Sequence, residues 1–164
     1  MKNIVLIGMP ASGKSTVGVI LAKTLGIGFV DVDLIIQQRE KTLLQDIIDK
    51  KGLDAFLDCE MNSVLSLKCE KCVISTGGSV VFRDLSMKKL KSNGIIVFLD
   101  VSPKTVKARL KNITTRGIAA SKSQTIDDIY NERLPLYKKY ADIVVNLDFC
   151  TAEDAVSKII FSLK

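Results

Sequence analysis

The chain has 164 residues, of which 47% are hydrophobic and 26% are charged, and its formal net charge is +6. This length predicts a single domain over residues 1–164 with a buried core, and it excludes a large motor or a multidomain ATPase. No apolar run reaches the ~20 residues that a membrane-spanning helix needs, and the N-terminus lacks the pattern of a signal peptide. We therefore expect a cytoplasmic protein that binds no membrane.

The positive charge balance admits nucleic acid as a ligand, but the composition favours small molecules. The 24 lysines and arginines are scattered along the chain, and aromatic residues make up only 5% of it. Few rings are therefore present for stacking on bases. A protein that binds a nucleotide and an anionic metabolite needs the same sign of charge. We expect small-molecule ligands, no nucleic-acid partner and a monomer.

The segment 8–15 matches every position of the phosphate-binding pattern G-x-x-x-x-G-K-[ST]. An apolar, β-branched strand pattern at 3–7 precedes it, and a helical pattern at 16–25 follows. In this setting backbone N–H groups face the phosphates, Lys14 adds a positive charge and Ser15 can hold Mg²⁺. A chance glycine-rich turn is the alternative. The predicted nucleotide contacts are Gly8, Ala11, Ser12, Gly13, Lys14, Ser15 and Thr16.

Downstream, apolar strand patterns alternate with helical patterns. Strands are expected at 27–33, 72–76, 94–100 and 143–146, and helices at 34–40, 43–51, 53–68, 86–92, 103–110 and 152–163. Continuous apolar strands separated by helices predict a parallel sheet covered on both faces. The fold class is therefore three-layer α/β, and the polar stretch 112–124 is expected to be a mobile loop.

Two acids, Asp31 and Asp33, end the second strand pattern. Positions i and i+2 of a strand point to the same side, so both carboxylates can reach the crevice beyond the sheet. We assign Asp31 to the magnesium shell, and Asp33 to orienting an acceptor hydroxyl and taking its proton. The structural alternative is that Asp33 caps the helix expected to begin at Leu34.

The four cysteines form one C-x-x-C pair, Cys69 and Cys72. A metal site there is disfavoured because the chain has no histidine and no second close pair of cysteines. In a reducing compartment they are expected to be thiols that fill core space.

Five motifs together resemble the shikimate kinase family in order and spacing. They are the phosphate loop, Asp31-Val32-Asp33, Ser75-Thr76-Gly77-Gly78, Arg116 in its polar loop and Glu132-Arg133-Leu134-Pro135-Leu136-Tyr137. The resemblance covers nearly the whole chain. It implies a five-stranded parallel sheet of the nucleoside-monophosphate-kinase type, acceptor-binding helices at about 34–68 and a lid at about 112–124. It also implies transfer of the γ-phosphoryl group of ATP to a hydroxyl of shikimate, with Mg²⁺ as cofactor, in aromatic amino-acid synthesis.

The same resemblance implies roles for residues outside the phosphate loop. Arg116 resembles the lid arginine that reaches the phosphates, and Arg109 the one that stacks on adenine; with Lys14 and Asp33, Arg116 completes the expected catalytic set. Arg133 resembles an arginine that clamps the acceptor carboxylate, for which its planar guanidinium is suited. The alternatives are that Arg133 is an ion-paired helix residue and that Gly77 and Gly78 form a plain turn. The expected acceptor contacts are Asp33, Gly77, Gly78, Ser79 and Arg133.

Three positions depart from the family pattern: Leu57, Ser79 and Gly117 stand where the family has Arg, Gly and Pro. Arg39 or Arg83 are candidates to replace the arginine missing at position 57. The departures leave two alternatives open. One is a kinase of the same fold acting on a polyol, a sugar acid or a nucleotide, and the other is a nucleotide-binding module without turnover. A pure binding module has no need of an acid such as Asp33 beside an acceptor pocket, which argues against the second alternative.

Overall fold

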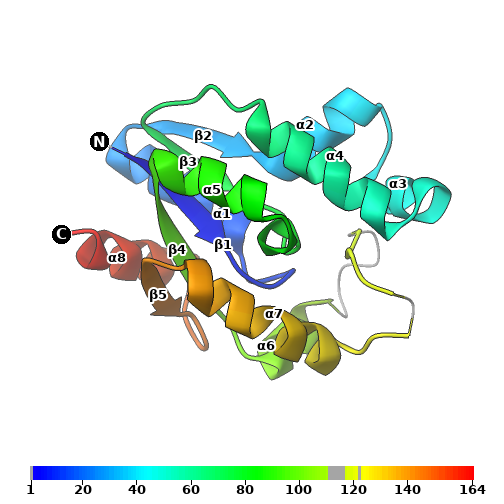
Figure 1. The fold of residues 1–164 in the computed structure, drawn as a ribbon. Helices are drawn as coiled ribbons and strands as arrows, with labels where there is room; N and C mark the ends of the chain where they lie inside the picture. Colours follow the sequence, from blue (N-terminus) through cyan, green and yellow to red (C-terminus); the bar gives the residue numbers. More distant parts are fainter. Residues whose placement is uncertain (1, 111–116, 122) are drawn as a thin grey trace.

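The computed structural model describes residues 2–110, 117–121 and 123–164, and its centre is one five-stranded parallel sheet (Figure 1). The strand order is β2-β3-β1-β4-β5, and each neighbouring pair is parallel. The strands are β1 (Asn3–Ile7), β2 (Gly28–Asp31), β3 (Cys72–Ser75), β4 (Gly94–Asp100) and β5 (Ile143–Asn146). The predicted fold class is therefore confirmed.

The central strand β1 is buried along its whole length because it pairs on both edges. Leu6 pairs with Ser75 of β3 on one side and with Val97 of β4 on the other. Since all strands run the same way, their carboxyl ends open at one edge of the sheet. In such sheets ligands bind in the crevice at this edge.

Helices cover the sheet on both faces. α1 and α8 pack together on one face, while α5 and α7 contact β4 on the other. α2, α3 and α4 contact one another beside the end of the sheet formed by β2 and β3. The helices are α1 (Lys14–Leu25), α2 (Val32–Glu40), α3 (Leu44–Lys51), α4 (Leu53–Leu65), α5 (Asp84–Ser92), α6 (Pro103–Leu110), α7 (Ile126–Tyr140) and α8 (Ala152–Ser162), with a short 3₁₀ helix η1 (Val80–Phe82).

The second strand is shorter than the apolar pattern predicts, because a helix cap interrupts it. Asp31 is the last residue of β2, and its Oδ1 accepts a hydrogen bond of 3.0 Å from the backbone N–H of Asp33. This cap starts α2 at Val32, so Asp33 lies in the first helical turn. The expected strand at 27–33 is wrong at its end, and the cap is Asp31 rather than Asp33.

Part of the predicted loop at 112–124 lies outside the described residues, namely 112–116 and 122. The described residues 117–121, 123 and 124 are neither helix nor strand. α7 follows after a capping box in which Thr125 and Asp128 bond reciprocally, which explains where that helix begins. Among the described residues, no helix combines the length and apolarity that a membrane crossing requires.

Candidate active site

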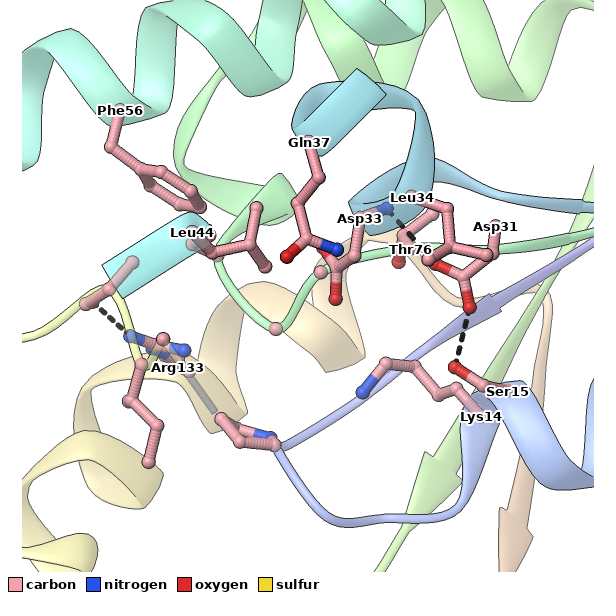
Figure 2. Close-up of a pocket in the computed structure, with 17 residues that line it drawn as sticks. Lys14, Ser15, Asp31, Asp33, Leu34, Gln37, Leu44, Phe56, Thr76 and Arg133 are labelled. Carbon is pink, nitrogen blue, oxygen red and sulfur yellow. Dashed lines mark hydrogen bonds between the residues drawn. The ribbon is translucent and has the colours of Figure 1, made fainter. Parts of the chain in front are cut away.

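A cavity of about 270 Å³ opens beyond the carboxyl ends of the strands (Figure 2). Its walls come from the phosphate loop, from α2, α3 and α4, from the loop after β3, from residues 117–119 and from α7. The lining residues are Pro10, Lys14, Ser15, Asp31, Asp33, Leu34, Gln37, Leu44, Phe56, Thr76, Gly77, Gly78, Ser79, Gly117, Ile118, Ala119 and Arg133. Every described residue that the sequence assigned to catalysis, metal or acceptor therefore lies on this one cavity.

Lys14 supplies the positive charge next to the phosphate loop. Its ammonium donates hydrogen bonds of 2.9 Å to the carbonyl of Gly8 and 2.7 Å to that of Met9. A third bond, of 3.3 Å, reaches the hydroxyl of Ser12. The side chain is only 7% exposed, and Figure 2 shows the ammonium pointing into the cavity. Lys14 therefore braces the loop while it faces the space where phosphates would lie.

Ser15 and Asp31 bring two oxygen ligands together at the start of α1. The Ser15 hydroxyl donates a 2.7 Å hydrogen bond to Oδ2 of Asp31 and lies 3.2 Å from the hydroxyl of Ser75. No cluster of three or more His, Cys, Asp or Glu side chains that could hold a metal occurs in the described part of the chain. One carboxylate and one hydroxyl suit Mg²⁺, which keeps several waters and takes further ligands from phosphates.

Asp33 reaches the cavity from the first turn of α2 rather than from a strand. Asp31 and Asp33 therefore do not lie two apart on one strand, and the predicted reason for their common direction is wrong. Both carboxylates nevertheless line the same cavity, because the turn from β2 into α2 lies at its rim. Figure 2 shows Asp33 directed into the space that Lys14 also faces.

The turn after β3 passes so close to two carboxyl groups that a side chain at position 77 would displace them. A Cβ atom on Gly77 would lie 2.2 Å from Oε1 of Glu60 and 3.1 Å from Oδ1 of Asp33. The carbonyl of Gly78 accepts a 2.6 Å hydrogen bond from the Tyr137 hydroxyl, which ties the turn to α7. The predicted acceptor-pocket turn thus lies between α2, α4 and α7.

Arg133 is a buried cation that retains unused hydrogen-bonding capacity. It is 1% exposed, and its guanidinium carbon lies 5.2 Å from the centre of the Phe82 ring. Nη2 donates a 2.5 Å hydrogen bond to the carbonyl of Ala119. Nε and Nη1 have no hydrogen-bond partner among the described residues. A buried guanidinium with two donors left over is suited to an anionic ligand.

Glu60, which the sequence reasoning missed, does not line the cavity itself but is buried directly behind two residues that do, Gly77 and Ser79. It lies on α4 behind Gly77, is 1% exposed, and its Oε2 accepts a 2.8 Å hydrogen bond from the Ser79 hydroxyl. Burial, and to a lesser extent the charge of Asp33, raises the pKa of Glu60 to about 8. The signal was the spacing of Phe56 and Glu60, because residues four apart share one face of a helix. Gln37 and Leu44 were missed as well.

A second cavity, of about 390 Å³, lies on the other side of the phosphate loop. Arg109 of α6 reaches over it and donates a 3.0 Å hydrogen bond from Nη1 to the carbonyl of Ala11. The lining residues are Ala11, Ser12, Gly13, Thr16, Val17, Arg109, Leu147, Cys150, Thr151, Ala152 and Ala155. Of the predicted nucleotide contacts, Lys14 and Ser15 line the first cavity, and Ala11, Ser12, Gly13, Thr16 and Arg109 line the second. Gly8 lines neither cavity.

A family model described as shikimate kinase matches residues 10–164. The chain belongs to the shikimate kinase family. A shikimate kinase of Thermodesulfovibrio yellowstonii is 39% identical over 163 residues, which cover 98% of this chain and 94% of the relative. The predicted enzyme class, an ATP-dependent small-molecule kinase, is thereby confirmed.

Solved structures of the family agree with the fold. A shikimate kinase from Acinetobacter baumannii in complex with shikimate matches with a TM-score of 0.93 at 28% identity, covering 99% of this chain and 93% of that one. The enzyme from Aquifex aeolicus matches with a TM-score of 0.84 at 36% identity, covering 98% and 95%. The nucleoside-monophosphate-kinase type of fold is therefore confirmed.

The structure places Leu57, the first departure from the family pattern, in the core. It is 8% exposed and is absent from the residues that line the first cavity, called the acceptor cavity below. Arg39 donates to the carbonyl of Asn62 and the hydroxyl of Ser66, outside the cavity. The idea that Arg39 replaces the missing arginine is therefore wrong for this arrangement of side chains.

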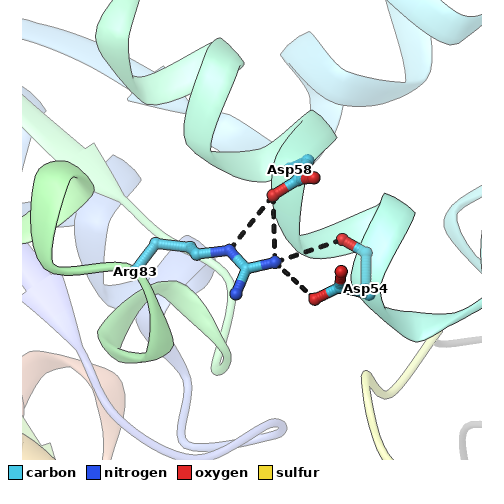
Figure 3. A network of polar contacts seen from close by, with 3 residues as sticks. All are labelled: Asp54, Asp58 and Arg83. Atoms are coloured by element: carbon cyan, nitrogen blue, oxygen red, sulfur yellow. Dashed lines mark hydrogen bonds and ion pairs between the residues drawn. The ribbon is translucent and has the colours of Figure 1, made fainter.

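Arg83, the second candidate replacement, is held on the surface by α4 (Figure 3). Its Nη2 lies 2.6 Å from Oδ1 of Asp54 and 2.9 Å from Oδ1 of Asp58. These two carboxylates hold the guanidinium against α4, and Arg83 is not among the residues that line the first cavity. Arg83 therefore forms ion pairs with α4. The idea that it replaces the arginine missing at position 57 is wrong as well.

Gly117, the third departure, has a packing reason. A Cβ atom at this position would lie 2.8 Å from the backbone nitrogen of Gln45 and 2.8 Å from Cβ of Leu44. The segment 117–119 therefore lies against the start of α3, where a side chain would not fit. Arg116 lies outside the described residues, and its assignment remains a prediction.

Proposed function

We propose that this kinase transfers the γ-phosphoryl group of ATP to a hydroxyl group of shikimate. The observation that carries the proposal is Arg133, a buried guanidinium whose Nε and Nη1 have no partner among the described residues. It lines the same cavity as Asp33 and Lys14. A small acceptor with one carboxylate and several hydroxyls matches this set, because Arg133 can grip the carboxylate with two hydrogen bonds while the hydroxyls face Asp33.

Asp33 orients the acceptor hydroxyl and takes its proton in this proposal. A carboxylate that lines the acceptor cavity from the first turn of α2 can approach a bound hydroxyl at hydrogen-bond distance. Lys14 neutralises the transferring phosphoryl group, with Arg116 assisting as the family resemblance implies. Phosphoryl transfer depends on positioning and on charge neutralisation, so these residues supply what the reaction needs.

Mg²⁺ would be held by the hydroxyl of Ser15 and the carboxylate of Asp31, directly or through water. The 2.7 Å separation of their oxygen atoms supports this assignment. When bound, the ion neutralises charge on the β- and γ-phosphates. Asp31 also caps α2, so it fixes the orientation of the helix that carries Asp33.

The second cavity is proposed to hold the adenosine part of ATP. The phosphate loop lies between the two cavities, and Arg109 and Thr16 line the second one. Cys150 lines it too, which permits a direct test by thiol alkylation. Mg-ATP should slow alkylation of Cys150, mapped by peptide mass spectrometry, and leave that of Cys72, the partly buried first residue of β3, unchanged. Equal protection of both thiols, or of neither, would place the nucleotide elsewhere.

The segment 34–68 is proposed to bind the acceptor, and 112–124 to act as the lid. Leu34, Gln37, Leu44 and Phe56 support the first assignment, and the cavity-lining residues 117–119 support the second. We also propose a monomer in the cytoplasm, where ATP is abundant, with no nucleic-acid partner. Light scattering after size-exclusion chromatography tests the oligomeric state.

A kinase acting on a different hydroxylated acceptor is the second candidate function. The observation that favours it is the apolar Leu57 at the position where the family has arginine. A coupled assay for ADP release, with shikimate first and then polyols, sugar acids and nucleosides, separates the two. A kcat/KM for shikimate at least tenfold above that for every other acceptor supports the first candidate. A higher kcat/KM for another compound replaces it with the second.

A further inference from the structure

Glu60 is a buried carboxyl group that has no salt-bridge partner among the described residues. It is 1% exposed, its Oε2 accepts one hydrogen bond from Ser79, and its Oε1 has no hydrogen-bond partner among the described residues. No lysine or arginine in that part of the chain lies within ion-pair distance of it. An ionised carboxylate in such a place carries a much larger desolvation penalty than the neutral acid does.

Asp33 adds a second reason for a neutral Glu60. Oε1 of Glu60 and Oδ1 of Asp33 lie 2.2 and 3.1 Å from the same point, the position that a Cβ atom of Gly77 would occupy. Two carboxyl groups this close disfavour a negative charge on both. Arg133 and Lys14 partly offset this effect, but burial outweighs them and the pKa of Glu60 rises to about 8.

Two hydroxyl groups, those of Ser79 and Tyr137, also lie near Glu60. Ser79 donates to Glu60 from the loop before η1, and Tyr137 of α7 is fully buried with its pKa raised, mainly by burial. Tyr137 therefore keeps its proton across the range in which Glu60 titrates. The charged neighbours that act on Glu60 are Asp33 on α2, Lys14 on α1 and Arg133 on α7.

Leu57 and Ser79 belong to this arrangement. Leu57 precedes Glu60 by three residues on α4, so the two positions are neighbours on one face of the helix. An arginine at position 57 would place a positive charge beside Glu60 and favour its ionised form. With leucine there, the hydroxyl of Ser79 is the donor that Glu60 uses. The two departures from the family pattern thus occur around the same carboxyl group.

We propose that Glu60 is a positioning residue that works with its carboxyl group protonated, holding the Gly77–Ser79 turn and adding no negative charge to the floor of the acceptor cavity. The proposal rests on the proposed function in so far as the acceptor is the shikimate anion. When Glu60 loses its proton, a buried charge forms beside Asp33 and opposes an anionic acceptor. Affinity for the acceptor should therefore fall as pH rises through the titration of Glu60.

The kinetic test is the KM for shikimate at saturating Mg-ATP, measured from pH 6.5 to pH 9.5. We expect the KM of the wild type to rise about five- to tenfold over this range. Glu60→Gln removes the titration, so its KM should stay constant with pH. Glu40→Gln is the matched control, since Glu40 pairs with Lys51 outside the cavity, and it should keep the rise seen in the wild type.

A second variant tests the same group if Glu60→Gln does not fold. The hydrogen bond from Ser79 favours the ionised form of Glu60 and so lowers its pKa. Ser79→Ala should therefore move the rise in KM to a higher pH. A rise that moves to a lower pH overturns the proposal.

A stability measurement tests Glu60 without any substrate. Because its pKa in the folded protein, about 8, lies above 4.5, the ordinary value of a glutamate, the folded state binds more protons than the unfolded state between these values. Stability must therefore fall as pH rises through this window. The Tm of the wild type should fall more between pH 5 and pH 9 than that of Glu60→Gln, with Glu40→Gln following the wild type.

The two measurements separate the possible failures. If the wild type phosphorylates no shikimate, the proposed function fails and the Tm profiles alone decide the state of Glu60. A wild-type KM that does not change with pH overturns the proposal. The proposal is also overturned if the KM of Glu60→Gln still rises with pH, or if the KM of Glu60→Gln at pH 6.5 is more than tenfold above that of the wild type. Parallel Tm profiles for the wild type, Glu60→Gln and Glu40→Gln overturn it as well.

Discussion

The guanidinium of Arg133 donates a 2.5 Å hydrogen bond from Nη2 to the backbone carbonyl of Ala119. This bond joins α7 to the segment 117–119 that lines the acceptor cavity. It leaves Nε and Nη1 of the same guanidinium for a ligand. One side chain therefore both holds the cavity wall and presents two hydrogen-bond donors that have no partner among the described residues.

Removal of the Arg133 guanidinium should weaken acceptor binding. A charged hydrogen bond is worth about 1.5–3 kcal/mol, so Arg133→Ala should raise the KM for shikimate at least about 10- to 100-fold. Arg133→Lys should be nearly as severe, since an ammonium cannot bond both oxygens of a carboxylate in one plane. Steady-state kinetics with Arg39→Ala as the control measures the effect. An unchanged KM in Arg133→Ala would exclude this residue from the acceptor site.

Lys14→Ala should abolish most phosphoryl transfer. In the proposed function the ammonium neutralises the transferring phosphoryl group, and loss of one such electrostatic contact lowers kcat by about 100- to 1000-fold. The variant also loses the bonds from Nζ to Gly8 and Met9, so the phosphate loop should become less ordered while the sheet stays folded. Circular dichroism and the ADP-release assay, with Lys23→Ala as the control, separate the two effects. A kcat equal to that of the wild type in folded Lys14→Ala would contradict the proposed mechanism.

Asp33→Asn should reduce turnover far more than ATP binding. The amide keeps the size of the side chain but cannot accept the acceptor proton, and general-base catalysis contributes about 100- to 10,000-fold. Calorimetry of Mg-ATP binding, compared with kcat, measures the split. Comparable losses in both quantities would assign Asp33 to the metal shell instead. Asp31→Asn is the matched variant, for which we expect a raised Mg²⁺ requirement.

Leu57→Arg should lower the KM for shikimate at a cost in stability. The new cation would lie beside Glu60 and near the acceptor carboxylate, where it restores the family's arrangement. Leu57 is 8% exposed within the core, so the substitution should also lower the Tm. The double variant Leu57→Arg with Glu60→Gln should lose most of the gain in KM, because the arginine then lacks its carboxylate partner. A raised KM in the single variant would support an acceptor other than shikimate.

The phosphate loop and the sheet could be predicted from the sequence because their signals are local. The pattern from Gly8 to Ser15 is contiguous, and each strand carries its own apolar run between helical patterns. The end of β2 was predicted incorrectly because the side chain of Asp31 bonds to the backbone of Asp33. Such a cap competes with the strand and is decided by a few local hydrogen bonds.

The acceptor cavity depends on tertiary packing, and its buried polar groups could not be found from spacing alone. Glu60, Ser79 and Asp33 are far apart in sequence, and they meet only because α2 and α4 pack beside the turn after β3. The partners of Arg39 and Arg83 likewise depend on the tertiary structure. Folding brings the hydroxyl of Ser66 to Arg39, and the carboxylates of Asp54 and Asp58 to Arg83. The sequence by itself determined which functional groups are present: a phosphate loop, two acids and a set of arginines. Only the folded chain decided which of them share one low-dielectric cavity, because burial and proximity, not residue type, set the charge that each group carries there.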